Sequence, residues 1–513
     1  MANIDSIKIR MYRHGFGDCF LLRFFSGKTL KFKMLIDCGL KHNDSVKEVP
    51  LADVVKDIIK EVSIKKDGKS VPHLDVLVIT HEHWDHVSAF KPERKLFDQF
   101  DVDKIWMAWT ENPKDEEAKI INAHLKKSIT ALAFAANKIS SNTEKKEKAG
   151  FFKNVYKGNE MLTVRKDYQF ALNSVTEFYG PLNIAKNVKT SPSGIQFKKN
   201  FKISIETQKA LDHVKSKLAK NKSGIEYFLP GKLMEKLDGL PGIRIYVLGP
   251  PKNEKLNKDT PSAGKNKEVY FGETNTSMMG FVRGILKMAG ADQGFDDGNP
   301  FTNVQNIKKV DAEKHPYYKG TYFKSDEAWR TIEDDWLDIT GALALQMDND
   351  TNNTSLALAI EMIDQEKILL FPGDAQVGNW LSWHDHTWKV TKNGKTESVN
   401  AENILNKTVF YKAGHHASHN ATLKTKGLEM MNHPDLVTFV PEKEDQYNGI
   451  PFEPLLTRLD ERCKGRVLVS ADKNFKAETR LKNKPAGLSA KEWKHFKDNI
   501  EINQLFIEYT IIG

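Results

Sequence analysis

The sequence has 513 residues, of which 40% are hydrophobic, so the chain can bury a large core, and its length permits roughly two to four domains. Only three cysteines occur, no apolar run approaches the ~20 residues of a membrane span, and no secretory signal pattern is visible at the amino terminus. These features argue against a disulfide scaffold and an integral membrane protein, and they favour a reducing, cytoplasmic compartment.

The charge balance is mildly basic. Lysine and arginine total 77 against 68 aspartates and glutamates, which gives a formal net charge of +9. Such an excess is compatible with a polyanionic substrate, but a lysine-rich solvated surface would produce the same total.

The first elements predicted are strands. Residues 7–25 and 31–36 form a strand pattern with a turn at Ser26-Gly27-Lys28. The second stretch ends in Asp37-Cys38-Gly39, where the Asp37 carboxylate can orient metal ligands from behind, although Asp and Gly also favour turns for their own sake. An amphipathic helix over residues 49–62 follows.

The most informative segment comes next, directly after an apolar strand. Residues 81–86 read His-Glu-His-Trp-Asp-His. A tight turn here can aim His81 and His83 at one cation, and Asp85 and His86 at a second, with nitrogen and oxygen ligands that suit zinc. A polar loop facing solvent is the alternative, but three histidines and an aspartate at this spacing make it a poor explanation.

The middle of the chain carries weaker patterns. After a strand at 104–109, residues 111–240 read as a partly helical elaboration, followed by a strand at 242–248. Residues 252–340 form a long insertion with helices predicted over 277–289 and from Asp326 onward. Such an excursion is either a lid over a cleft or a peripheral stabilising subdomain.

Basic residues gather in this middle region. Residues 197–202 interleave aromatic and basic side chains, and the helix that follows carries several lysines, including Lys209 and Lys215. This stripe can track a phosphate backbone, or it can be an ordinary solvated face.

Two further strand ends carry ligand-type residues. Residues 367–371 form an apolar strand that leads to Asp374, a carboxylate able to bridge two cations about 3.5 to 4 Å apart. Residues 408–412 form another strand, followed by His415, His416 and His419. Histidines and carboxylates thus follow four predicted strands.

Together these segments resemble the metallo-beta-lactamase superfamily. Three short motifs, Gly15–Cys19, Asn352–Leu356 and Lys412–Ser418, look like its ComEC-type competence branch. That branch includes hydrolase domains attached to, or related to, DNA-uptake channels. The resemblance covers residues 5–110 and 340–513.

The resemblance implies an α/β fold, the four-layer αβ/βα sandwich of this superfamily, here built from residues 1–251 and 341–513 with a large insertion. It also implies two Zn²⁺ ions, with Mn²⁺ as the alternative. By carry-over, the metal ligands are His81 and His83 for the first ion, Asp85 and His86 for the second, Asp374 as the bridge, and His415 or His416 to complete the shell.

One family ligand lacks a counterpart. Many members place a further histidine between the first motif and the bridging aspartate, whereas this interval offers only His124, His213 and His315, none of which follows a strand. We therefore expect the histidines at 415, 416 and 419 to supply two ligands.

The function implied is a dinuclear metal-dependent hydrolase, a phosphodiesterase or nuclease whose nucleophile is a metal-bridging hydroxide. Asp85 and Asp374 would ligate and orient, while His419 and Lys412 would contact developing charge on the substrate; a solvated Lys412 is the alternative. A histidine rather than a glutamate at position 83 disfavours di-iron redox chemistry.

Two other functions remain open. One is hydrolysis of a small ester, thioester or lactone. The other is a metal-stabilised binding component of a multi-protein system, with a protein partner that the sequence does not identify.

Overall fold

The structure is a computed structural model. It describes the following residues: 3–41, 49–123, 125–126, 129, 178–180, 188–191, 194–197, 205–219, 224–252, 307, 309–324, 347–392, 394–443, 450–471 and 477–513. The predicted helices at 277–289 and from Asp326, and with them most of the proposed lid, lie outside these residues, as does His124.

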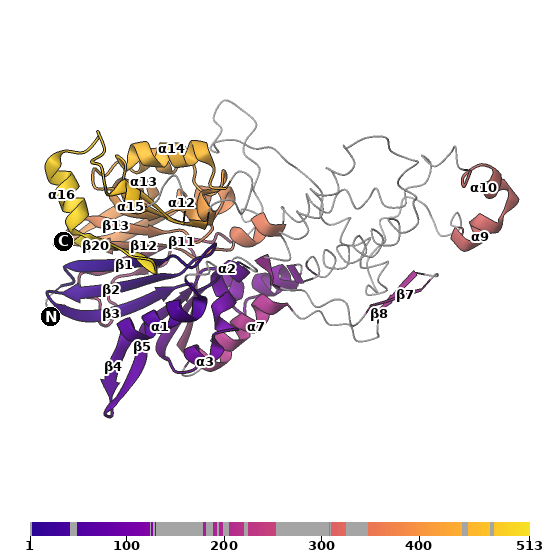
Figure 1. Ribbon diagram of the computed structural model, residues 1–513, viewed down its shortest axis with the longest axis horizontal. Coiled ribbons are helices and arrows are strands. Elements are labelled where there is room, and N and C mark those ends of the chain that lie inside the picture. The colour runs from indigo at the N-terminus through magenta and orange to yellow at the C-terminus, as the bar shows by residue number, and fades with distance from the viewer. Residues whose placement is uncertain are drawn as a thin grey trace.

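Within the described residues, the chain forms two large mixed sheets (Figure 1). The first sheet has nine strands, with β4 (Ser63–Lys66) pairing to β5 beside the main path. Along that path the order is β19 (Ile500–Ile502), β20 (Phe506–Ile512), β1 (Ser6–Tyr12), β2 (Phe20–Ser26), β3 (Thr29–Ile36), β5 (Lys69–Ile79), β6 (Asp101–Ala108) and β9 (Ile225–Phe228).

The second sheet has seven strands in the described part of the chain. Their order is β10 (Leu233–Met234), β11 (Ile243–Gly249), β12 (Ala357–Met362), β13 (Lys367–Phe371), β16 (Thr408–Lys412), β17 (Val437–Lys443) and β18 (Val467–Ala471). Residues from both sides of the long insertion therefore share one sheet, because β11 pairs with β12.

The two sheets pack face to face, and helices cover their outer faces. In β3, Met34 and Ile36 join the core between the sheets, while Leu35 joins the core under the helices. This alternation is what a strand buried on both faces requires. The observed architecture is thus a layered α/β sandwich.

The helices divide between the two outer faces (Figure 1). Those that pack on the first sheet are α1 (Leu51–Val62), α2 (Trp84–Val87), α3 (Arg94–Phe97) and α7 (Glu206–His213). Those that pack on the second are α12 (Val377–Trp383), α13 (Ala401–Asn406) and α14 (Glu453–Arg462). Near the carboxyl terminus follow α15 (Ala477–Arg480) and α16 (Ala490–Asp498).

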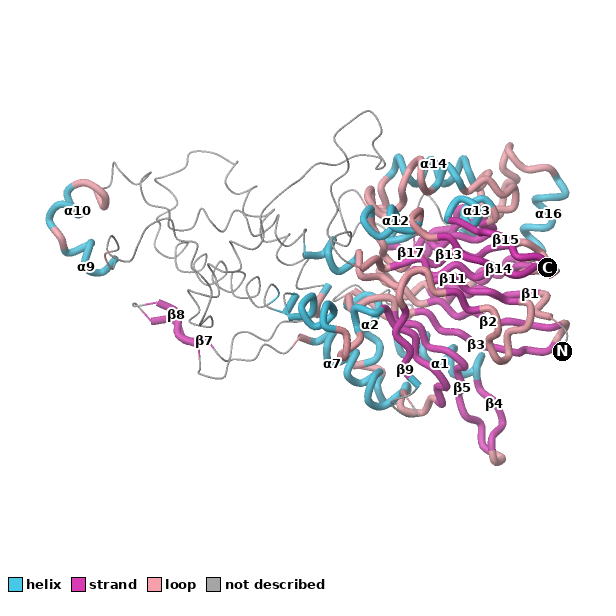
Figure 2. The backbone as a smooth tube through the Cα atoms, turned by 180° about the vertical axis from the view of Figure 1, so that it is seen from behind, coloured by secondary structure: helices cyan, strands magenta, loops and turns pink. Residues whose placement is uncertain are grey.

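Smaller elements complete the described chain. A hairpin pairs β14 (Thr387–Lys392) with β15 (Lys395–Asn400). The hairpin of β7 (Val188–Ser191) and β8 (Gly194–Phe197), and the helices α9 (Lys309–Lys314) and α10 (Pro316–Gly320), lie apart from the two large sheets (Figure 2). Among the described residues, no helix combines the length and apolar character that a membrane span requires.

The directions of the strands determine where functional side chains can lie close together. β3 runs parallel to β5, and β13 runs parallel to β16, so within each sheet the carboxyl ends of these strands meet at one edge. A backbone hydrogen bond of 2.9 Å from Leu356 to Thr80 ties the two edges together. The residues that follow these strands are therefore neighbours in space.

The strand predicted over residues 7–25 is interrupted in the structure. Residues 7–25 form two strands, β1 and β2, rather than one extended stretch. The break falls at Gly15 and Gly17, whose φ angles are 135° and 155°. A Cβ at Gly17 would lie 2.4 Å from the carbonyl oxygen of Gly39, so glycine is needed for this loop to pass so close to the end of β3.

Candidate metal centre

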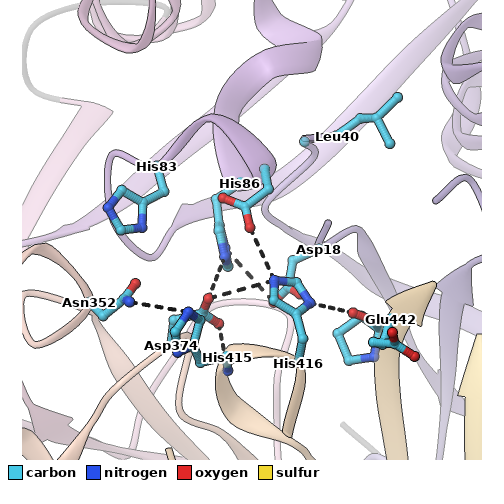
Figure 3. A network of polar contacts seen from close by, with 12 residues as sticks. Asp18, Leu40, His83, His86, Asn352, Asp374, His415, His416 and Glu442 are labelled. Carbon is cyan, nitrogen blue, oxygen red and sulfur yellow. Dashed lines mark hydrogen bonds and ion pairs between the residues drawn. The ribbon is translucent and has the colours of Figure 1, made fainter. Parts of the chain in front are cut away.

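Four buried side chains that follow three strands converge at the shared edge. Asp85 and His86 follow β5, Asp374 follows β13, and His416 follows β16, and one donor atom from each lies within 4.8 Å of the others. The His86 Nε2 atom is 3.0 Å from Asp374 Oδ2 (Figure 3). The His416 Nε2 atom is 3.0 Å from Asp85 Oδ2. We call these residues the four-residue group.

Asp37 lies directly behind this group. Its Oδ2 atom is 2.8 Å from His86 Nδ1 and accepts the Thr80 hydroxyl at 2.6 Å, while Oδ1 accepts the Thr80 backbone N–H. Asp37 is fully buried, and its φ of 55° turns the chain sharply after β3. The carboxylate thus fixes the ring of His86 with Nε2 directed at the group.

Asp374 is held by a second set of contacts. Its Oδ1 atom accepts from Lys412 Nζ at 2.8 Å and from the backbone N–H of His415 at 3.0 Å. Lys412 Nζ also donates to the carbonyl oxygen of Gly373 at 2.8 Å and lies 2.5 Å from Asp18 Oδ2. Lys412, Asp18 and Asp374 are each at most 2% exposed.

Two glycine-containing loops support the backbone of Asp85 and His86. A Cβ at Gly39 would lie 2.3 Å from the Asp85 carbonyl carbon and from the His86 nitrogen. Asp18 N–H donates to the Asp85 carbonyl, and Cys38 N–H donates to that of His86, both at 2.9 Å. The close approach explains why both motifs, Gly-Phe-Gly-Asp and Asp-Cys-Gly, are built on glycine.

The loop after β16 separates two adjacent histidines. Residues 415, 416 and 417 all have left-handed backbones, with φ of 42°, 51° and 62°. Non-glycine residues rarely adopt this conformation, and a run of three is a strained turn that the surroundings must hold. It directs His416 into the group, with Nδ1 hydrogen-bonded to the Pro441 carbonyl oxygen, and leaves His415 outside it.

His81 and His83 form a separate pair beside the group. The Nε2 atom of His81 lies 3.0 Å from Nδ1 of His83, and both rings are about 1% exposed. The other ring nitrogen of His83 faces the Tyr179 hydroxyl at 3.3 Å and Asp348 Oδ1 at 3.7 Å. The pair therefore presents two imidazole nitrogens toward one point.

His415 lies in a polar cluster on the other side. Its Nδ1 is 2.8 Å from Ser418 Oγ and 3.2 Å from Gln376 Nε2. Its Nε2 is 3.4 Å from Asn352 Nδ2 (Figure 3). The Asp348 carboxylate accepts from the same Asn352 amide at 3.1 Å. This cluster lines the site between His83 and His415.

Sequence reasoning did not assign roles to Asp18, Asp348 or Asn352. Asp18 belongs to the Gly-Phe-Gly-Asp motif and Asn352 to the Asn-Asn-Thr-Ser segment, which are the motifs of the resemblance, so a signal existed for both. Asp348 carries no comparable pattern, and it meets His83 only in the folded chain, with its Oδ1 atom 3.7 Å from His83 Nε2.

The protonation states follow from burial and neighbouring charge. Burial lowers the pKa of His83 to about 4 and of His415 to about 3, so both are neutral at pH 7. For Asp85, burial raises the pKa, but the charge of His86 and the contact with His416 outweigh it and lower the value to about 2. Burial lowers the pKa of His86, yet Asp374 and its fellow carboxylates raise it well above the ordinary range.

These groups fit a divalent cation. The Oδ1 atom of Asp85 is buried and has no hydrogen-bond partner among the described residues. The carboxylates around His86 raise its pKa, so a positive charge is favoured at this point, and a divalent cation would take the place of the ring proton. Two carboxylates and two imidazoles form a donor set that suits Zn²⁺ or Mn²⁺.

Two further predicted site residues, Lys412 and His419, lie outside the four-residue group. Lys412 is 1% exposed and fully engaged with Asp18, Asp374 and a carbonyl oxygen, so it positions the Asp374 carboxylate rather than reaching substrate. His419 is exposed and packs against Phe452, with ring centroids 6.1 Å apart, so the expectation that it joins the ligand cluster is not met.

The described part of the basic stripe is paired with acids. Lys209 Nζ lies 2.8 Å from Glu206, and Lys215 Nζ lies 2.7 Å from Glu111. His213 is buried on α7 with Nε2 3.4 Å from Asp98, away from the four-residue group. These lysines thus hold neighbouring carboxylates instead of presenting free charge.

Comparison of the sequence with models of known protein families yields no match, and comparison with curated proteins yields none either.

Proposed function

We propose that this chain is a metal-dependent hydrolase of the metallo-beta-lactamase type that cleaves phosphodiester bonds in nucleic acid. The convergence of Asp85, His86, Asp374 and His416 at one buried point carries the proposal. Divalent cations held there would supply Lewis acidity and a water of lowered pKa at neutral pH.

The surrounding residues support hydrolysis by the positions they impose. Asp37 fixes His86, and the Pro441 carbonyl oxygen fixes His416, so both imidazoles are oriented before a ligand arrives. The unpartnered Oδ1 atom of Asp85 is free to accept a proton or a hydrogen bond from an attacking water. The layered sandwich and the strand-end ligands are also what the proposed superfamily requires.

His81 and His83 provide a second place for a cation. Burial lowers the pKa of His83 to about 4 and that of His81 well below its ordinary value, which keeps both imidazoles in the neutral form that binds metals. With the four-residue group, the pair makes a dinuclear centre the natural interpretation.

Nucleic acid is the substrate that two features of the sequence favour. It is supported by the resemblance to the ComEC-type branch and by the formal net charge of +9. The pairing of Lys209 and Lys215 with carboxylates removes two of the lysines that would have strengthened it.

The test is cleavage by purified protein. Labelled single-stranded DNA, duplex DNA and RNA are incubated with the protein and Zn²⁺ or Mn²⁺, beside a panel of an ester, a thioester and a lactone. We expect nucleic-acid cleavage that falls roughly 100-fold or more in Asp85→Asn. Asp53→Asn, an exposed aspartate on α1, is the matched control and keeps full activity.

Two outcomes would count against the proposal. Turnover of an ester, thioester or lactone without nucleic-acid cleavage would keep the hydrolase and reject the substrate. Equal cleavage by wild type and Asp85→Asn would assign the activity to a contaminant and reject catalysis at this site.

A further inference from the structure

The two cation positions differ in the completeness of their donor sets. In the four-residue group, two donor pairs lie 3.0 Å apart, and His416 Nε2 lies 3.9 Å from Asp374 Oδ2. Ligands bound tetrahedrally at about 2.0 to 2.1 Å lie roughly 3.3 to 3.5 Å from one another. The group therefore needs little movement to enclose a cation.

The histidine pair offers less. Among the described residues, no histidine, cysteine, aspartate or glutamate joins His81 and His83 in a set whose donor atoms all lie within 4.8 Å. A cation at this pair would need a carboxylate. Asp348 Oδ1 lies 3.7 Å from Nε2 of His83, which is not the ring nitrogen that faces His81. We therefore take Asp374 of the four-residue group as the carboxylate to be shared. A second cation can bind there only if an oxygen atom of Asp374 is available as a ligand.

The structure leaves Asp374 only one oxygen for metal. Its Oδ1 atom already accepts two hydrogen bonds, at 2.8 Å from Lys412 Nζ and at 3.0 Å from the His415 N–H. Its Oδ2 atom faces His86 and belongs to the four-residue group. A cation at the pair would have to share Oδ2 or displace Lys412.

Lys412 is difficult to displace. Its ammonium lies 2.5 Å from Asp18 and 2.8 Å from Asp374, and all three side chains are at most 3% exposed. Little water screens this charge, so the ammonium also repels a second cation brought close to Asp374.

We propose that the centre binds two cations unequally, with one held tightly by the four-residue group and one held weakly by His81 and His83. The second is weaker because no further acidic, histidine or cysteine ligand among the described residues completes the pair, and because the buried ammonium of Lys412 at Asp374 repels a second cation. This inference rests on the proposed function only in that the centre binds metal. Lys412 is thus a positioning residue that sets the affinity of the second position.

The experiment is an equilibrium titration of the metal-free full chain with Zn²⁺. A chromophoric chelator reports affinity, and elemental analysis after dialysis reports stoichiometry. We expect one tight equivalent and a second that binds at least ~100-fold more weakly. His83→Gln should remove the weak equivalent alone, and His86→Gln should remove the tight one.

Lys412→Met tests the cause. It keeps the length of the side chain and removes the charge, so we expect the second affinity to rise about tenfold or more. Lys389→Met, an exposed lysine on β14, is the control and should leave both affinities unchanged. If Lys412→Met does not fold, the wild-type stoichiometry and the His83→Gln titration still decide whether the positions are unequal.

The inference is overturned if wild type binds two equivalents with the same affinity, if His83→Gln loses the tight equivalent, or if folded Lys412→Met binds like wild type. Failure of the proposed function looks different. Unequal binding without any hydrolysis would reject the function alone, whereas hydrolysis with two equal sites would reject this inference alone.

Discussion

The loops after β5 and β16 both deliver one histidine to the four-residue group, but they do so by different means. After β5, helix α2 begins at Trp84, and the spacing within 81–86 separates a histidine pair from Asp85 and His86. After β16, adjacent histidines are sent to different places by a left-handed backbone. Spacing therefore predicts the first loop, whereas the second depends on conformation.

Truncating each of the two adjacent histidines is the most direct test of this difference between the loops. His416→Ala removes a donor from the four-residue group, so we expect loss of the tightly bound cation and a fall in hydrolysis of roughly 100-fold or more. His415→Ala should keep that cation, because its ring contacts Ser418, Gln376 and Asn352 instead. Elemental analysis and turnover measure both effects, and equal metal loss would show that the loop does not separate them.

A smaller effect is expected at the carboxylate behind His86. Asp37→Asn weakens the contact that orients the ring, and such changes lower metal affinity about 10- to 100-fold. Competition with a chelator measures the change, with Asp53→Asn as the control. An unchanged affinity would mean that Asp37 acts only as a turn former, the alternative that its sequence left open.

The segment after β3 packs closely against Asp85 and His86, and this contact gives a prediction about stability. Gly39→Ala places a Cβ 2.3 Å from the backbone of Asp85 and His86, so we expect a loss of about 1 to 3 kcal/mol in the free energy of unfolding. Gly27→Ala, at a φ of 58° with open space around it, should cost only about 1 kcal/mol. Denaturant unfolding measures both, and equal losses would leave steric contact at Gly39 without support.

The mildest prediction concerns pH. Burial lowers the pKa of His83 to about 4 and of His415 to about 3, from an ordinary value of 6.5. Below pH 6.5, these two histidines bind protons in the unfolded chain but stay neutral in the folded chain. The metal-free protein should therefore lose stability as the pH falls from 6.5 toward 4. His415→Gln should reduce this slope, as denaturant unfolding at several pH values will show.

The sequence by itself determined the elements that supply the site. Apolar runs predicted the strands at 31–36, 367–371 and 408–412, and polar residues directly after them predicted ligand positions. The helix expected over 49–62 is confirmed as α1. The strands and the helix are confirmed because hydrophobic periodicity is a local property of the chain, whereas the ligand roles of the residues that follow remain predictions.

Only the tertiary structure decided which residues meet. The role of Lys412 depends on Asp18, almost 400 residues earlier in the chain. The contact of Asp348 with His83 likewise joins two distant segments. The choice between His415 and His416 depends on three left-handed residues, a conformation that local propensity disfavours and that the surrounding packing must impose. Periodicity predicts which residues end a strand, but contacts between distant segments and an imposed φ arise only when the two sheets pack together.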